Sequence, residues 1–247
     1  MGWGGTGGAR RTSSWQVPGS PLMWIAVAAA VVVMVILVRS HRIQQDQLIY
    51  FVVLIPSIIL HEISHGVVAL AFGDDTAKQA GRLNLNPVRH IDPVGTLLVP
   101  ALLSLSGVGA YGWAKPVPVN ANRLRSPRNH VVIVSLVGPL TNFALAAVLG
   151  VIYAQTLPAN GGFPLYSQFL FYAGVANIVL GVFNLIPCPP LDGASVLERL
   201  LPARLLPDYY RLQPFLMFLP FILILLFRNQ WSELINHVII WWQQLVS

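Results

Sequence analysis

Long apolar runs limit what this chain can fold into more than any other feature of its sequence. Leu22–Val38 is apolar throughout, and Leu48–Phe72, Val131–Tyr153 and Leu165–Ile186 are longer still. A helix of about 17–25 residues is long enough to cross the hydrocarbon core of a bilayer. We therefore expect an all-α integral membrane protein.

The composition excludes the other broad classes. Hydrophobic residues make up 55% of the 247 residues and charged residues only 10%, whereas soluble domains carry about 25% charged residues. Disordered chains are polar and charge-rich, so disorder is excluded too. The net charge of +6 comes from basic residues scattered between apolar runs, which predicts no nucleic-acid partner. The single cysteine, Cys188, excludes an internal disulfide.

The ends of the chain differ from its centre. Residues 1–21 are Gly/Ser-rich and predict a disordered cytosolic tail, whereas residues 22–227 predict a polytopic membrane domain. Leu22–Val38 lacks a cleavage site for a signal peptide, so we expect an uncleaved span. Tyr209–Phe227 is a weaker candidate because it contains an arginine and two prolines. Residues 231–246 alternate apolar and polar faces at helical spacing, which predicts an amphipathic interfacial helix.

Gly95–Ala114 either crosses the membrane or re-enters from the same side. A crossing would divide the Lys and Arg residues nine to six between the two sides, whereas re-entry divides them twelve to three. Because Lys and Arg gather on the cytosolic side, we favour a re-entrant segment at 95–114 with the N-terminus in the cytosol. The whole chain is then expected to have about five to six transmembrane helices.

The motif that carries chemistry lies inside one of the spans. His61 and His65 are four residues apart on one helix face, where both imidazoles can hold one zinc. Glu62 can take a proton from water at the open coordination position. Charged groups in a spanning helix cost about 2.5 kcal/mol or more each unless they are paired, which favours a functional site.

A third metal ligand has to come from elsewhere in the chain. The nearest candidates are Cys188 and Asp192, in a segment where three prolines between 187 and 190 end the preceding helix. Non-helical backbone at membrane depth is tolerated only where protein or a wet cavity surrounds it. A carboxylate there suits a zinc ligand, although Asp192 is also a good N-cap for a helix over Gly193–Leu201.

Three motifs in order now resemble the site-2 protease family of intramembrane zinc metalloproteases. They are His61–His65, Gly138–Asn142, and Asn184–Pro187 running on to Leu191–Gly193. The likeness covers residues 48–201, the expected catalytic core, and it corresponds to the compact bacterial type without PDZ or CBS domains.

The resemblance implies roles for six residues: zinc ligands at His61, His65 and Asp192, acid–base catalysis by Glu62, and substrate or oxyanion support from Asn184 and Asn142. Gly81–Asn86 and Tyr111–Asn120 resemble strand-like segments of bacterial members. We expect a small membrane-associated β hairpin or re-entrant segment. Gly81–Asn86 either receives an unwound substrate by strand addition or is an ordinary connecting hairpin.

The expected function is that of a Zn²⁺-dependent intramembrane endopeptidase in the cell membrane. It would hydrolyse peptide bonds in or near transmembrane segments of single-span substrates, within the lipid bilayer and with its active site towards the cytosol. The sequence names no regulatory partner. The alternative is an intramembrane metal-ion transporter, because intramembrane His and Asp also mark ion paths. A transporter would need several ligand clusters, and the sequence contains one.

Overall fold

The computed structural model describes residues 45–90, 92, 115–158, 162–216 and 219–246. Three of its helices are long and apolar enough to cross a membrane: α2 (Gln45–Ala71), α6 (Pro127–Thr156) and α7 (Leu165–Asn184). They correspond to three of the predicted runs, and they indicate a multi-pass membrane protein. The tail at 1–21, the run Leu22–Val38 and the segment Gly95–Ala114 lie outside the described residues.

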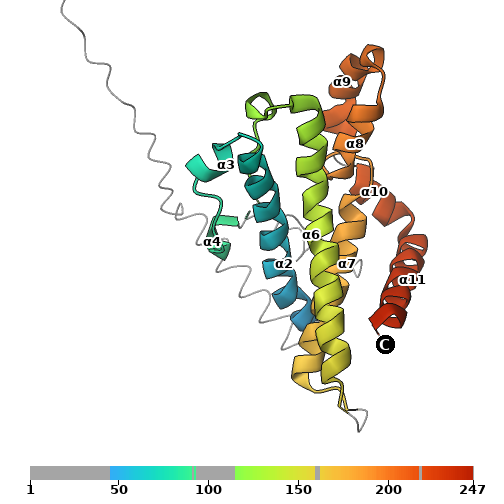
Figure 1. The fold of residues 1–247 in the computed structure, drawn as a ribbon. Helices are drawn as coiled ribbons and strands as arrows, with labels where there is room; N and C mark the ends of the chain where they lie inside the picture. The colour runs from blue at the N-terminus through green and yellow to red at the C-terminus, as the bar shows by residue number, and fades with distance from the viewer. Residues whose placement is uncertain (1–44, 91, 93–114, 159–161, 217–218, 247) are drawn as a thin grey trace, which may run out of the picture.

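The three long helices lie side by side and form the centre of the molecule (Figure 1). Their shared core contains Val53 of α2, Ala146 of α6, and Val175 and Ala176 of α7, all buried. Large apolar side chains also cover outward faces of the helices, with Leu140 of α6 as an example. An apolar outer face is what a lipid environment requires, because lipid tails offer no hydrogen bonds.

Short helices and turns follow α2. They are α3 (Thr76–Gln79) and α4 (Pro87–His90), and a 3-10 turn, η2 (Ala121–Arg123), precedes α6. Asp74 joins these parts, because its carboxylate accepts hydrogen bonds from the backbone N–H groups of Thr76 (3.0 Å) and Asn120 (2.5 Å). The C-terminal end of α2 is thereby fixed to the segment that leads into α6.

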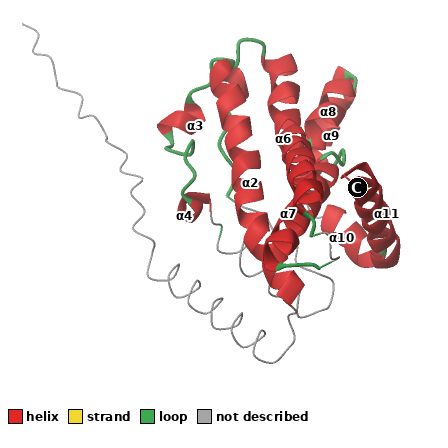
Figure 2. Cartoon of the chain, turned by 60° about the horizontal axis from the view of Figure 1, so that its bottom comes forward, coloured by secondary structure: helices red, strands yellow, loops and turns green. Residues whose placement is uncertain are grey.

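The predicted β hairpin is not formed in the part of it that the structure describes. Gly81–Asn86 is a loop that contains one turn residue and two bends, and residues 115–120 pair with no strand. The described ranges contain helices and loops only (Figure 2). Local hydrogen bonds explain why this segment is a loop. The Asn84 side chain donates to the Gly81 carbonyl and accepts from the Asn86 N–H at 3.0 Å. Such side-chain bonds compete with a strand ladder for the backbone.

Apart from Phe227, the described residues of the weaker candidate span, Tyr209–Phe227, lie in two helices, and residues 217–218 between them lie outside the described ranges. α8 (Gly193–Leu200) and the turn η3 (Ala203–Leu205) lead into α9 (Leu206–Leu216), and α10 (Leu219–Leu226) follows. As described, α9 has 11 residues and α10 has 8, so the described residues do not test whether this candidate spans. Pro220 stands at the second residue of α10, where a missing N–H breaks no helical bond.

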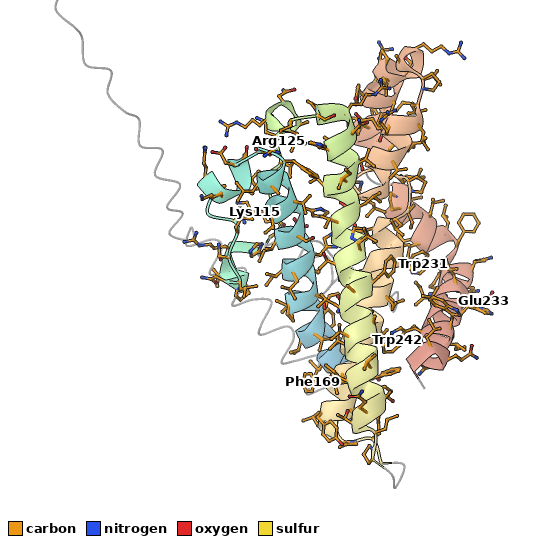
Figure 3. The ribbon with its side chains drawn as sticks, viewed as in Figure 1. Lys115, Arg125, Phe169, Trp231, Glu233 and Trp242 are labelled. Atoms are coloured by element: carbon orange, nitrogen blue, oxygen red, sulfur yellow. The ribbon has the colours of Figure 1, made fainter. Side chains whose placement is uncertain are left out.

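The C-terminal segment forms the helix α11 (Arg228–Val246), as the apolar spacing predicted. One face of α11 packs against α6 and α7 through Trp242, which points inward in Figure 3, while Glu233 points away from the bundle. The Trp242 indole N–H donates to the Ala146 carbonyl at 3.3 Å. Part of the apolar face therefore contacts protein.

Candidate metal centre

The helix α2 presents His61 and His65 one turn apart, and both side chains are buried. Their rings meet edge to face with centroids 4.7 Å apart. Gly138 of α6 lies against both rings, since a Cβ at this position would come within 2.5 Å of His65 Nε2 and 2.6 Å of His61 Cε1. A glycine at 138 therefore allows α6 to approach the two imidazoles.

Asp192 reaches the histidines from a loop that follows α7. Its Oδ2 atom lies 3.0 Å from His61 Nε2 and 3.5 Å from His65 Nε2. The loop folds back tightly, because a Cβ at Gly193 would come within 2.3 Å of the Leu185 carbonyl oxygen. Asp192 is the N-cap residue of α8, but its side chain makes no capping hydrogen bond. The Asp192 carboxylate therefore faces the two histidines instead of capping α8.

These donor atoms fit a divalent cation. The three ligand atoms lie within 4.8 Å of one another, and Asp192 Oδ2 is buried without a hydrogen-bond donor. Around a tetrahedral zinc with bonds of about 2.0–2.1 Å, ligand atoms are about 3.3 Å apart. The two distances to Asp192 Oδ2 are close to this value. Within the described ranges, no other group of three such side chains is found.

The far nitrogen of each imidazole has a hydrogen-bond acceptor. His61 Nδ1 lies 2.5 Å from Asn142 Oδ1, and His65 Nδ1 lies 2.6 Å from the Val134 carbonyl oxygen. An acceptor at Nδ1 favours the tautomer with its proton there, so the lone pair of each Nε2 faces Asp192.

Asn142 does not have the environment expected of a substrate-binding residue. It is 0% exposed, its Oδ1 faces His61, and its Nδ2 donates to Asn177 Oδ1 at 2.8 Å. Asn177 and Ser57, which also take part in this network, were not among the predicted site residues. Polar side chains inside apolar runs were the signal that could have identified them.

Glu62 is partly buried next to His61 on α2. Its Oε2 accepts a hydrogen bond from the backbone N–H of Val117 at 2.8 Å. This bond comes from the described segment that leads into α6, and it fixes the orientation of the carboxylate.

The last two sequence candidates lie in the segment between α7 and α8. Asn184 is the final residue of α7, and its side chain donates to the Leu180 carbonyl of the same helix at 3.0 Å. Cys188 Sγ contacts the Leu216 carbonyl at 3.5 Å and is not part of the metal-binding group. The cysteine alternative for the third ligand therefore has no geometric support.

Sequence comparison places the chain among known proteins. YwhC of Bacillus subtilis is 42% identical over 156 residues, which are 61% of this chain and 68% of YwhC. Rip2 of Mycolicibacterium smegmatis is 37% identical over 144 residues, 58% of this chain and 53% of Rip2. MJ0392 of Methanocaldococcus jannaschii is 29% identical over 154 residues, 62% of this chain and 34% of MJ0392. All three are named zinc metalloproteases, the first two provisionally.

The chain thus spans about two thirds of YwhC and about half of Rip2. No solved structure matches it. Residues 163–227, which include α7 and the Asp192 loop, match Peptidase family M50. The identity and coverage shared with YwhC, together with this match, show that the chain belongs to peptidase family M50, the site-2 protease family.

Proposed function

We propose that this M50 peptidase is a zinc-dependent intramembrane endopeptidase that cleaves peptide bonds in or near transmembrane segments of membrane-anchored proteins. Family membership makes it a membrane metalloprotease. One observation supports placing this activity at a particular site. The ligand atoms of His61, His65 and Asp192 lie within 4.8 Å of one another, and Glu62 is next to His61 in the sequence.

His61, His65 and Asp192 are the proposed zinc ligands. Two imidazoles and one carboxylate are a common ligand set of catalytic zinc, which keeps a further position open for reaction. The names of the relatives support zinc as the metal. When bound, zinc would supply Lewis acidity, which polarises a scissile carbonyl and makes an attacking water more acidic.

Glu62 is the proposed general base and acid. Its position next to a ligand on the same helix suits it to take a proton from the attacking water and to give it to the leaving amine. The Val117 N–H holds Oε2 and so restricts the rotation of the carboxylate. Asn184 remains the proposed substrate or oxyanion contact, and its side chain would have to leave the Leu180 carbonyl to serve in that role.

The position of the site along α2 supports cleavage within the membrane. His61 lies about 24 Å from Gln45 at 1.5 Å per residue, so the histidines lie inside a helix of spanning length. A substrate helix hides its carbonyls in its own hydrogen bonds. We therefore propose that a single-span substrate unwinds locally before cleavage.

The proposed orientation has the metal-binding end of α2 towards the cytosol. Basic side chains gather in the segments that follow this end of the helix, and Figure 3 shows Lys115 and Arg125 there. The other members of the group are Lys78, Arg82, Arg89 and Arg123. Because Lys and Arg mark cytosolic loops, their distribution supports an active site near the cytosolic face.

The deciding experiment uses Glu62→Gln, with zinc content and cleavage of a model single-span substrate measured together. We expect zinc content to stay at the wild-type value and cleavage to fall by about 10²–10⁴-fold, the usual contribution of a general acid–base group. Cleavage at the wild-type rate in the variant would contradict the proposed role of Glu62. A metal-ion transporter, which the single ligand group in the described residues does not favour, would instead keep its flux.

A further inference from the structure

We infer that three buried side chains, Asn142, Asn177 and Ser57, form a hydrogen-bonded chain that orients His61 as a metal ligand. We call them the amide chain. The inference rests on the proposed metal-binding role of His61, and it assigns positioning roles to residues that do not touch the metal.

The amide chain runs through all three long helices. His61 Nδ1 of α2 faces Asn142 Oδ1 of α6 at 2.5 Å, and Asn142 Nδ2 donates to Asn177 Oδ1 of α7 at 2.8 Å. Asn177 Nδ2 then donates to Ser57 Oγ of α2 at 2.9 Å, and Ser57 Oγ donates to the Val53 carbonyl at 2.8 Å. The chain therefore starts and ends on α2, one helical turn below His61.

The direction of every bond follows from the last acceptor. The Val53 carbonyl can only accept, so the Ser57 hydroxyl donates to it and offers a lone pair to the amide N–H of Asn177. The carbonyl of Asn177 must then face Asn142 and accept from its amide N–H. The carbonyl of Asn142 is left for His61, whose Nδ1 has to carry the proton.

A second contact fixes the orientation of Asn177. Its Nδ2 also donates to the Ala173 carbonyl at 2.8 Å, so both amide hydrogens have acceptors and a flipped amide would lose both bonds. All three members of the amide chain are buried, and Asn142 is fully so. Away from water, a reversed or broken bond would leave an unpaired polar group, so the arrangement is strongly preferred.

His65 provides an internal comparison. Its Nδ1 faces the backbone carbonyl of Val134, which no side-chain substitution removes. Changes in the amide chain should therefore act on one ligand, His61, and leave the other two in place. Partners of this kind, behind a metal ligand, typically contribute about 10–100-fold in metal affinity.

The test measures Zn²⁺ affinity of the full chain in detergent by competition with a chelator, together with the visible absorption of the Co²⁺ form. We expect Asn142→Leu and Asn177→Leu to weaken Zn²⁺ binding by about 10–100-fold and to change the Co²⁺ spectrum. Ser57→Ala removes the hydroxyl that bonds Asn177 and should weaken binding by about two- to fivefold.

Two further variants separate positioning from packing. Ser167→Ala makes the same chemical change as Ser57→Ala at another fully buried serine, whose hydroxyl has no partner among the described residues, and it should leave affinity unchanged. Asn142→Asp keeps an acceptor for the His61 Nδ1 proton and should bind metal more tightly than Asn142→Leu. A purely structural role predicts the reverse order, because a buried charge destabilises more than an isosteric apolar group.

The outcomes distinguish this inference from the proposed function. If both leucine variants bind Zn²⁺ with wild-type affinity while His61→Ala does not bind it, the positioning role of the amide chain is wrong. The proposed metal site is then still supported. If the wild-type chain binds no Zn²⁺, or if His61→Ala and Asp192→Ala bind it as tightly as wild type, the proposed function fails first. Should the leucine variants not fold, equal affinities of Ser57→Ala and Ser167→Ala would overturn the inference.

Discussion

Gly138 of α6 lies directly against His65, so that a Cβ at position 138 would come within 2.5 Å of Nε2, the ring nitrogen that faces Asp192. The Gly138→Ala variant would place a methyl group where that nitrogen faces Asp192. We expect weaker Zn²⁺ binding and a loss of activity on the order of a hundredfold, since misplacing a reacting group by about 1 Å has effects of that size. Zinc content after dialysis and cleavage of a single-span substrate measure the two effects.

The control for this substitution is Gly174→Ala on α7. A Cβ there would come within 2.2 Å of the Trp242 ring, which creates a comparable clash where α7 meets α11 and not at the two histidines. It should lower the unfolding temperature without changing the zinc content. Equal zinc content in Gly138→Ala and the wild type would show that the approach of α6 is not needed for binding.

The assignment of the third ligand predicts different results for two nearby substitutions. Asp192→Asn keeps the size of the side chain but removes the charge that balances the cation, so Zn²⁺ should be lost during dialysis against a weak chelator. Cys188→Ser should keep its Zn²⁺, because Cys188 Sγ contacts the Leu216 carbonyl instead of the histidines. Zinc per chain, measured by elemental analysis, checks both. If Cys188→Ser loses its zinc and Asp192→Asn keeps it, the third ligand is Cys188 and not Asp192.

Sequence spacing was sufficient to predict those parts of the site that depend on residues close together in the sequence. The four-residue spacing of His61 and His65 puts them on one helix face in any helix, and the prolines before Asp192 end α7 wherever it packs. The apolar runs likewise predicted α2, α6 and α7, because spanning length follows from residue count.

The parts that depend on packing could not be predicted. The resemblance identified Asn142 as a motif residue, but the direction of its side chain depends on how α6 faces α2. Asn177 and Ser57 become partners only when α7 and α2 lie together, and periodicity carries no information about that register. Gly81–Asn86 resembled a strand in sequence but forms a loop, in which the Asn84 side chain bonds the local backbone.

Asp74 predicts a pH-dependent contribution to stability outside the membrane-spanning segments. Burial alone would raise the pKa of this carboxyl group, but hydrogen bonds from Thr76 and the Asn120 N–H outweigh it and lower the pKa. A lowered pKa in the folded state stabilises the fold above the unfolded value of about 3.9, and this stability is lost as pH falls through the lower folded pKa.

The variant Asp74→Asn should therefore be destabilised at pH 7 by about 1.5–3 kcal/mol, the typical range for hydrogen bonds to a charged group. Its deficit relative to wild type should shrink as the pH falls below about 4. Thermal unfolding in detergent at several pH values measures this. Asp75→Asn is the control, because the Asp75 side chain is 45% exposed and its ion pair with Arg123 lies at the surface. A deficit in Asp74→Asn that does not vary with pH would contradict the argument.

The docking of α11 predicts different effects for two adjacent tryptophans. Trp242 is 3% exposed and belongs to the buried cluster that contains Ala146 and Val179, whereas Trp241 is 58% exposed. Trp242→Ala should lower the free energy of unfolding by about 3–5 kcal/mol, the usual cost of removing a large buried aromatic side chain. Trp241→Ala should change it by less than about 0.5 kcal/mol. Unfolding of both variants in detergent, followed by circular dichroism, makes the comparison. If the two variants unfold at the same temperature, α11 does not pack on α6 and α7 in the folded protein, and its apolar face belongs at the membrane surface as the sequence pattern first indicated.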